Sequence, residues 1–475
     1  MNSLLPVRFY RLAAVAVIAN GALGVPRCPA EESVAAVSRG AALAAAAIRL
    51  PAGYRATPVA SEPQLANPVA FCFDRRGRIF VAETHRVRKG VEDNRWHMDW
   101  LDDDLAAKSV ADRRAFMTRR MGDRIHEYAD ASDQVRLLED RDRDGRYEWS
   151  SVFSTGYNNV EDGAAAGVLC IDDWVLLTCI PSLWELKDLD GDGQAEHREP
   201  LASGFGVHVA LFGHDLHGLC EGPDGKIYFS IGDRGFNVTT REGAELVNLD
   251  SGAVLRCNRD GSGLELFATG LRNPQELAFN EWGDLFTVDN NSDAGDKARL
   301  VHVVEGMQAG WRMSYQYLPD CGPFQRERIW ETENDQQPAS IVPPLTHVTE
   351  GPSGLAFYPG TGLPAENQGA LFVCDFLGMP ASSGVRRLWV EPHGATYRLT
   401  RDAMFAEGVL ATDCDFGPDG ALYVADWIDG WTGAGAGRIH RIASDDAAAA
   451  AGARATQTLL SDMPRKSVDE AVALL

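Results

Sequence analysis

The chain has 475 residues, a formal net charge of −23 at pH 7 and 45% hydrophobic residues. This surplus of acids argues against nucleic acid or an anionic membrane surface as a partner, because both attract basic patches. The 47 glycines are typical of a turn-rich globular protein, and the length allows either one long all-β domain or two to three smaller domains.

The first thirty residues have the pattern of a secretory signal peptide. Arg8 and Arg11 precede an apolar run from Leu12 to Leu23, and small residues follow at its end. Because this run is too short for a comfortable membrane span, we expect residues 1–30 to be removed and the protein to be periplasmic or secreted, with no remaining span. Residues 31–50 then read as an alanine-rich linker, and residues 34–48 as a tether.

From residue 51 onward one unit recurs: a turn, usually with glycine, then a short strand, then often an acid. Its copies are residues 74–83, 171–178, 222–233, 280–289, 367–375 and 417–426, of which 171–178 is the weakest. Further strands are expected at 123–128, 182–188, 252–258, 299–304 and 437–442. Repetition of such units is the signature of a propeller, so we predict an all-β, six-bladed β-propeller over 51–445, with inserted loops and a short helical tail over 446–475.

A large insertion, residues 87–121, follows the first of these units. It holds Trp96, His97 and Trp100 and a charged segment with helical character. Either its aromatic residues cover one face of the propeller, or the whole segment is a solvated excursion. The second interpretation is the one we favour from sequence.

Two acidic runs predict structural calcium sites. Each has carboxylates at alternate positions before a glycine, which lets the backbone turn so that the oxygens converge on one cation. The first run consists of Asp140, Asp142 and Asp144, and the second of Asp188, Asp190 and Asp192, with Glu199 at the twelfth position. The alternative is a pair of acidic β-turns without metal.

The most informative stretch is residues 270–296. Arg272 can direct two N–H donors at a planar anion, Asn273 and Gln275 offer amides beside it, and Pro274 fixes the local backbone. Such a turn is suited to a flat, acidic ligand, and the polar loop at 290–296 offers oxygens to a hard cation. A capped loop without a ligand is the alternative.

Two histidines, His214 and His217, lie just before the strand of the third unit. A histidine can accept a proton near neutral pH, which makes both candidates for a catalytic base. A loop histidine taken alone is more often structural, but the Arg272 turn follows one unit later.

These motifs together resemble the soluble quinoprotein glucose/sorbosone dehydrogenases. The resemblance is carried by GHDLHGL at 213–219, GPDGKIYFSIGDRG at 222–235, GLRNPQELAF at 270–279, DNNSDAGD at 289–296 and GW at 310–311. It implies a six-bladed propeller that binds pyrroloquinoline quinone (PQQ) and calcium and oxidises a sugar or another small hydroxylated substrate. A cytochrome-type electron acceptor on another chain is then a possible partner.

The blade phrases also resemble the propeller of large planctomycete-type "membrane-bound dehydrogenase domain" proteins. Those proteins often continue into helical repeats and a haem-binding C-x-x-C-H, a motif that this sequence lacks.

The resemblance assigns roles to single residues. It places the catalytic base on His214 and a glycine position on His217, and it makes Arg272 and Asn273 the cofactor-contacting pair, with Gln275 beside them and Asn290 as a further contact. The backbone carbonyls of Asn291 and Ser292 would bind calcium.

The same alignment shows departures on the cofactor side. The family directs one lysine and two arginines at the quinone carboxylates, but Ser382, Leu410 and Thr412 stand near those positions. Losing three cations from a tricarboxylate site is a large electrostatic loss, since a charge-assisted hydrogen bond contributes about 1.5–3 kcal/mol. Arg386, Arg387 and Arg438 are the possible substitutes.

Two other functions fit the same fold, because fold alone does not determine function. One is a non-catalytic propeller that binds carbohydrate or protein on one face. The other is a calcium-dependent hydrolase of the lactonase type.

Overall fold

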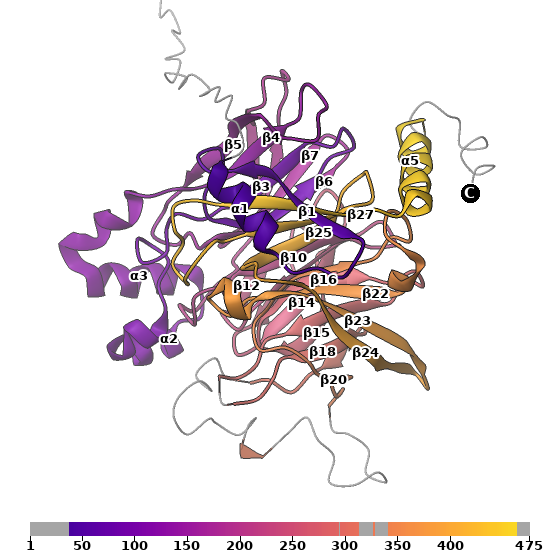
Figure 1. Cartoon of the computed structure of the whole chain (residues 1–475). Coiled ribbons are helices and arrows are strands. Elements are labelled where there is room, and N and C mark those ends of the chain that lie inside the picture. Colours follow the sequence, from indigo (N-terminus) through magenta and orange to yellow (C-terminus); the bar gives the residue numbers. More distant parts are fainter. Residues whose placement is uncertain (1–37, 294, 313–325, 328–340, 463–475) are drawn as a thin grey trace, which may run out of the picture. The chain divides into compact units, whose positions relative to one another are not determined.

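The computed structural model describes residues 38–293, 295–312, 326–327 and 341–462, and the predicted signal peptide lies outside these ranges. The described chain forms six main sheets and one separate hairpin, β12 (Phe236–Thr239) with β13 (Glu245–Asn248) (Figure 1). Each of the six sheets is one blade of a β-propeller.

The blades follow one another along the chain. Blade one contains β2 (Pro68–Phe73), β3 (Ile79–Glu83), β4 (Asp133–Glu139) and β5 (Trp149–Tyr157). Blade two contains β6 (Ala165–Ile171), β7 (Trp174–Cys179), β8 (Ser182–Lys187) and β9 (His197–Ser203). Blade three contains β10 (Leu216–Glu221), β11 (Ile227–Ile231), β14 (Gly252–Cys257) and β15 (Glu265–Leu271), with the short β19 (Met307–Gln308) parallel at its edge.

The second half repeats this arrangement. Blade four contains β16 (Pro274–Phe279), β17 (Leu285–Asp289), β18 (Arg299–Val303) and β20 (Thr346–His347). Blade five contains β21 (Pro352–Phe357), β22 (Ala370–Asp375), β23 (Gly384–His393) and β24 (Thr396–Glu407). Blade six contains β25 (Ala411–Phe416), β26 (Leu422–Asp426) and β27 (Arg438–Ser444), and β1 (Tyr54–Ser61) adds its fourth strand.

The first strand of each blade contacts the first strand of the next, and β25 contacts β2, so these inner strands form a closed ring around one axis. Chain closure comes from β1, which pairs antiparallel with β27 from Tyr54↔Ser444 to Ser61↔Arg438. This pairing joins the first strand of the chain to the last blade and so closes the ring, which leaves only short blade edges exposed.

The six predicted turn-and-strand units are confirmed as the second strands β3, β7, β11, β17, β22 and β26, one per blade. The reason is the same in each: a tight turn reverses the chain, and a run of apolar residues then enters the sheet interior. Every residue of β11 is buried, for example, and Gly225 in the preceding turn has φ +75°, which glycine adopts without strain. Apolar residues of adjacent blades share continuous hydrophobic clusters.

The sequence prediction was wrong at residues 123–128. They belong to the 3₁₀ helix η3 (Gly122–Ala129), and the strand that pairs with β3 is β4. Local β-propensity pointed to the wrong segment because the long insertion moves the true partner further along the chain. The predicted strands at 182–188, 252–258, 299–304 and 437–442 do form, as β8, β14, β18 and β27.

The helices lie outside the blades. The expected tether contains α1 (Arg39–Ala47), whose Ser38 side chain accepts a hydrogen bond from the Ala41 N–H and whose Ala41 and Ala45 are buried. The predicted helical tail contains α5 (Ala447–Asp462). No helix in the described ranges is long and apolar enough to cross a membrane.

The insertion is not the solvated excursion that we favoured. It forms η1 (Asn94–Trp96), η2 (Met98–Trp100), α2 (Leu101–Ala106) and α3 (Val110–Met121) before η3. Trp100 and Phe116 are buried in a cluster with Val207 and Val209, which follow blade two. The insertion is therefore packed against the propeller, as the alternative interpretation required.

Candidate functional site

A cavity of about 540 Å³ opens where the inner strands begin. Its lining comes from the insertion and from loops of several blades, because loops at the same end of successive blades point toward the axis. His214, His217, Arg272, Asn273, Gln275, Asn290 and Asn291 all line it. Residues up to 77 positions apart, from His214 to Asn291, thus meet in one pocket.

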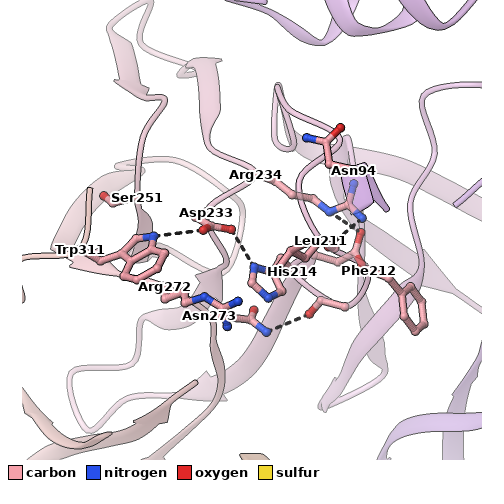
Figure 2. Close-up of polar contacts among 12 residues, drawn as sticks. Asn94, Leu211, Phe212, His214, Asp233, Arg234, Ser251, Arg272, Asn273 and Trp311 are labelled. Atoms are coloured by element: carbon pink, nitrogen blue, oxygen red, sulfur yellow. Dashed lines mark hydrogen bonds and ion pairs between the residues drawn. The ribbon is translucent and has the colours of Figure 1, made fainter. Parts of the chain in front are cut away.

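His214 forms a hydrogen-bonded pair with a buried carboxylate (Figure 2). Its Nδ1 lies 2.7 Å from Oδ1 of Asp233, and Oδ2 of Asp233 accepts a hydrogen bond of 3.0 Å from Nε1 of Trp311. His214 is only 3% exposed and Asp233 is fully buried. Because the carboxylate holds Nδ1, Nε2 is the ring nitrogen left for a ligand, and a neutral imidazole in this tautomer can accept a proton there.

The carbonyl oxygen of Gly213 fixes the turn that carries His214. It accepts hydrogen bonds from Nδ2 of Asn273 at 3.1 Å and from Nε2 of Gln275 at 3.4 Å, and it lies 2.8 Å from Nε2 of His217. Burial lowers the pKa of His217, which favours the neutral ring. His217 therefore braces the turn that carries His214 through its contact with Gly213.

Arg272 and Asn273 are held by a buried ion pair beneath them. Both backbone N–H groups donate to Asp289, whose carboxylate is also bound by the guanidinium of Arg299. The side chain of Arg272 lies over the ring of Trp311, 5.4 Å from its centre, and donates to Asp293 at 3.0 Å. Arg272 is 1% exposed, and its Nε has no hydrogen-bond partner within the described chain.

Gly232 allows the two parts of the site to approach each other. A Cβ atom at this position would lie 2.7 Å from Oδ1 of Asn273 and 2.8 Å from Cβ of His214. Both distances are shorter than real Cβ contacts, so any larger residue would push His214 and Asn273 apart.

In the predicted calcium loop, residues 290–296, some side chains line the pocket and others bond within the loop. Asn290 and Asn291 line the cavity, together with Asp293. Ser292 is buried, and its N–H and hydroxyl both donate to Asp296, which closes the loop. Calcium binding by Asn291 and Ser292 therefore stays a prediction.

The two acidic runs lie away from this pocket, in hairpins of blades one and two. Oxygens of Asp188, Asp190, Asp192 and Glu196 lie within 4.8 Å of one another, as do those of Asp140, Asp142 and Glu148. Glu199 is on β9, where it pairs with Glu185, so Glu196 stands where sequence spacing had placed Glu199. Asp144 is outside the first group, and its N–H donates to Asp140 and Asp142.

Several pocket residues were not singled out from sequence. Asp233 was visible only as the acid that ends a repeat unit, and its contact with His214 depends on the antiparallel pairing of β10 with β11, which places residues before β10 beside residues after β11. Trp427, Trp431 and Phe376 come from blades five and six and supply an aromatic side of the cavity. A tryptophan shortly after a strand that ends in an acid is the signal that would have found Trp427.

The fold and the pocket define this chain as a six-bladed β-propeller with a histidine–carboxylate pair in its central cavity. It belongs to the family described as domain of unknown function DUF7133, which matches residues 41–431.

Among curated proteins, quinoprotein glucose dehydrogenase B of Acinetobacter calcoaceticus is similar. It is 33% identical over 135 residues, which cover 23% of this chain and 28% of that protein. The match thus spans less than a third of the relative, whose activity can be considered for this chain only as a proposal.

Solved structures share the fold over most of the chain. A Thermus thermophilus protein described as an oxidoreductase (glucose dehydrogenase) is 20% identical with a TM-score of 0.50, over 82% of this chain and 100% of that one. Another glucose dehydrogenase is 17% identical with a TM-score of 0.52, over 81% of this chain and 98% of that one. At these identities the likeness shows the fold alone.

The resemblance implies that the pocket binds the three carboxylates of PQQ. The side chains present do not fit such a ligand. Ser382 is exposed on η5 (Pro380–Ser382), Leu410 is buried, and Thr412 lines the pocket without a charge. The substitutes are engaged outside the lining: Arg386 with Asp402, Arg387 with Asn367, and Arg438 with Glu62.

Charge in the cavity points the same way. The described lining contains three arginines and five carboxyl groups. One of the five, Glu276, has a pKa well above its usual range because burial, and then the charge of Asp413, disfavours its ionised form. Even with that group neutral, the carboxylates outnumber the arginines, which opposes a trianionic ligand.

Proposed function

We propose that this chain is an oxidoreductase of the sugar dehydrogenase type, in which His214 removes the proton of a substrate hydroxyl. The observation that carries the proposal is the buried His214–Asp233–Trp311 chain of hydrogen bonds, which leaves Nε2 of His214 toward the cavity. The fold shared with glucose dehydrogenases supports it.

The chemistry of the step follows from this geometry. The hydroxyl proton passes to Nε2 of His214, and Asp233 stabilises the imidazolium that forms. A quinone-class acceptor, when bound, would take the hydride from the carbon that bears the hydroxyl, and that carbon would become a carbonyl carbon. Arg272 and Asn273 line the part of the cavity where such an acceptor would lie.

The proposal includes a small hydroxylated substrate such as a sugar, export to the periplasm or outside the cell, and transfer of electrons to a cytochrome-type acceptor. Calcium would polarise the acceptor as a Lewis acid, held by the loop that contains Asn290, Asn291 and Ser292.

The test separates binding from chemistry. His214→Ala should lower dye-linked oxidation of an aldose panel by about 10²- to 10⁴-fold, the usual contribution of a general base, and should leave quinone and sugar affinity unchanged. Arg272→Ala should weaken quinone binding instead. The turnover rates are measured by kinetics and the affinities by calorimetry, on purified protein supplied with calcium and with PQQ or another ortho-quinone.

A second candidate is a non-catalytic carbohydrate-binding propeller. It is favoured by the aromatic residues Trp427, Trp431 and Phe376 and by the shortage of cations in the pocket. Sugar binding without oxidation under every acceptor condition would support this candidate and contradict the enzyme.

A further inference from the structure

Blades five and six form one side of the cavity, called here the aromatic wall: Ser353, Phe376, Thr412, Trp427 and Trp431. Phe376 and Trp431 pack edge to face with ring centres 5.0 Å apart, and Trp431 remains 59% exposed. Trp427 is 4% exposed. No lysine or arginine from these two blades lines the cavity within the described ranges.

The hydroxyl groups of the wall are already used. Oγ of Ser353 donates to the carbonyl of Ala411 at 3.1 Å, and Oγ1 of Thr412 donates to the carbonyl of Pro68 at 2.8 Å. A hydroxyl has one proton to donate, so neither group can also donate to a carboxylate. Nε1 of Trp427 is buried, so it too is closed to a ligand. The wall thus offers aromatic surface to a ligand, and its described donors are either used or buried.

The cations on the rest of the lining are committed to other groups. Arg272 donates to Asp293, Arg95 binds Asp93 at 2.8 Å, and Arg88 lies 4.3 Å from the ring centre of Trp96. A carboxylate placed against the aromatic wall would lose its hydration without gaining a cation, which is costly. An uncharged aromatic edge, in contrast, has no charge to desolvate and can pack against the rings of the wall.

We propose that the acceptor bound in this pocket is an uncharged aromatic ortho-quinone with one edge against the aromatic wall. The identity of this ligand as the hydride acceptor rests on the proposed function. PQQ, with three carboxylates, is then a poor ligand for this chain.

The first experiment compares ligands that differ in charge. Quenching of tryptophan fluorescence is measured on the purified protein with PQQ, with its uncharged trimethyl ester and with a neutral tricyclic ortho-quinone. We expect at least one neutral compound to bind at least tenfold more tightly than PQQ, with affinity nearly independent of salt, because no cationic contacts are screened. PQQ binding as tight as that of both neutral compounds would overturn the proposal.

The second experiment adds charge to the wall. Thr412→Arg should tighten PQQ at least tenfold relative to the neutral quinone, because the new guanidinium would meet a carboxylate. Thr412→Gln is the matched control of similar length without charge and should leave the preference for the neutral quinone in place. Should Thr412→Arg fail to fold, Ser353→Lys, at another lining position of the wall, replaces it with the same expectation.

These measurements distinguish the two proposals. If the neutral quinone binds and no sugar is oxidised, the proposed function fails while the inference on ligand charge stands. If sugar is oxidised with PQQ alone and neither neutral quinone binds, the inference on charge fails while the function stands.

Discussion

At the scale of single residues, the site is a set of side chains whose polar atoms are held by one another. Asp233 is hydrogen-bonded to His214 and to Trp311. The carbonyl oxygen of Gly213 contacts the side chains of Asn273, Gln275 and His217. In the proposed enzyme, such mutual support would hold His214 in one orientation before a substrate arrives, as proton abstraction requires.

This arrangement predicts that Asp233→Asn will be more damaging to turnover than to folding. An amide at this position can donate to Nδ1 of His214, which moves the ring proton to Nε2 and removes the lone pair that accepts the substrate proton. We expect kcat to fall by about 10²- to 10⁴-fold while sugar affinity stays within about threefold.

The control is Trp311→Phe, which removes the other hydrogen bond to Asp233 but leaves the tautomer of His214 in place. Its kcat should fall less than that of Asp233→Asn in the same dye-linked assay. Equal losses in the two variants would mean that the carboxylate acts through packing rather than through the tautomer.

At the scale of elements, loops inserted into the blades were the hardest part to derive from sequence. The acid at Asp233 ends a repeat unit, as acids end several others, so its pairing with His214 could not be told from an ordinary strand end. β4 was missed because about fifty residues, Thr84 to Ser132, separate it from its partner β3. His214 and the Arg272 turn were identified because their residue types are chemically distinctive over short spans.

The second acidic hairpin gives a prediction at this scale. If calcium binds at Asp188, Asp190, Asp192 and Glu196, it stabilises the fold by mass action, by about 2.7 kcal/mol at a hundredfold excess over Kd. We expect calcium to raise the melting temperature of the parent by several degrees and to leave that of Asp190→Ala nearly unchanged.

The matched control is Asp173→Ala, an exposed acid of another turn, which should keep the calcium response. Melting curves are recorded with calcium and with a chelator. Identical curves for the parent under the two conditions would contradict calcium binding, and the hairpin would then be an acidic turn.

At the scale of the whole molecule, repetition made the architecture predictable. Each blade begins its second strand with a similar turn, so counting those turns gave the six blades that the sheets confirm. Counting turns could not predict that β1 closes blade six or that β19 lies at the edge of blade three. Both pairings involve segments that do not belong to the repeat.

Closure of the ring also brings carboxyl groups of different blades together around the axis. Glu276 of β16 and Asp413 and Asp415 of β25 lie on inner strands, where burial raises the pKa of Asp413 to about 7 and that of Asp415 to about 6. Cys72 of β2 also faces the charge of Asp415, and Cys374 of β22 faces Asp413 and Glu276. The propeller therefore concentrates negative charge on its axis as pH rises.

The sign of the resulting pH dependence follows from these shifts. A carboxyl group whose folded pKa is raised binds a proton more tightly in the folded chain than in the unfolded one, where its pKa is about 3.9. Its effect on stability is therefore absent below about pH 4, and the free energy of unfolding falls as pH rises toward the folded pKa. Above about pH 7 the full cost of ionising Asp413 and Asp415 is present.

Asp415→Asn should remove part of this cost, because asparagine stays neutral and its side-chain oxygen can still accept the hydrogen bond from the Phe416 N–H. At pH 8 we expect the variant to be more stable than the parent by about 1–2 kcal/mol, since Asp415 keeps part of its surface exposed and the cost is moderated. At pH 4.5 the two proteins should differ little. Urea unfolding at both pH values measures the difference, and a gain of equal size at pH 4.5 and pH 8 would show that the substitution acts through packing and not through the charge on the axis.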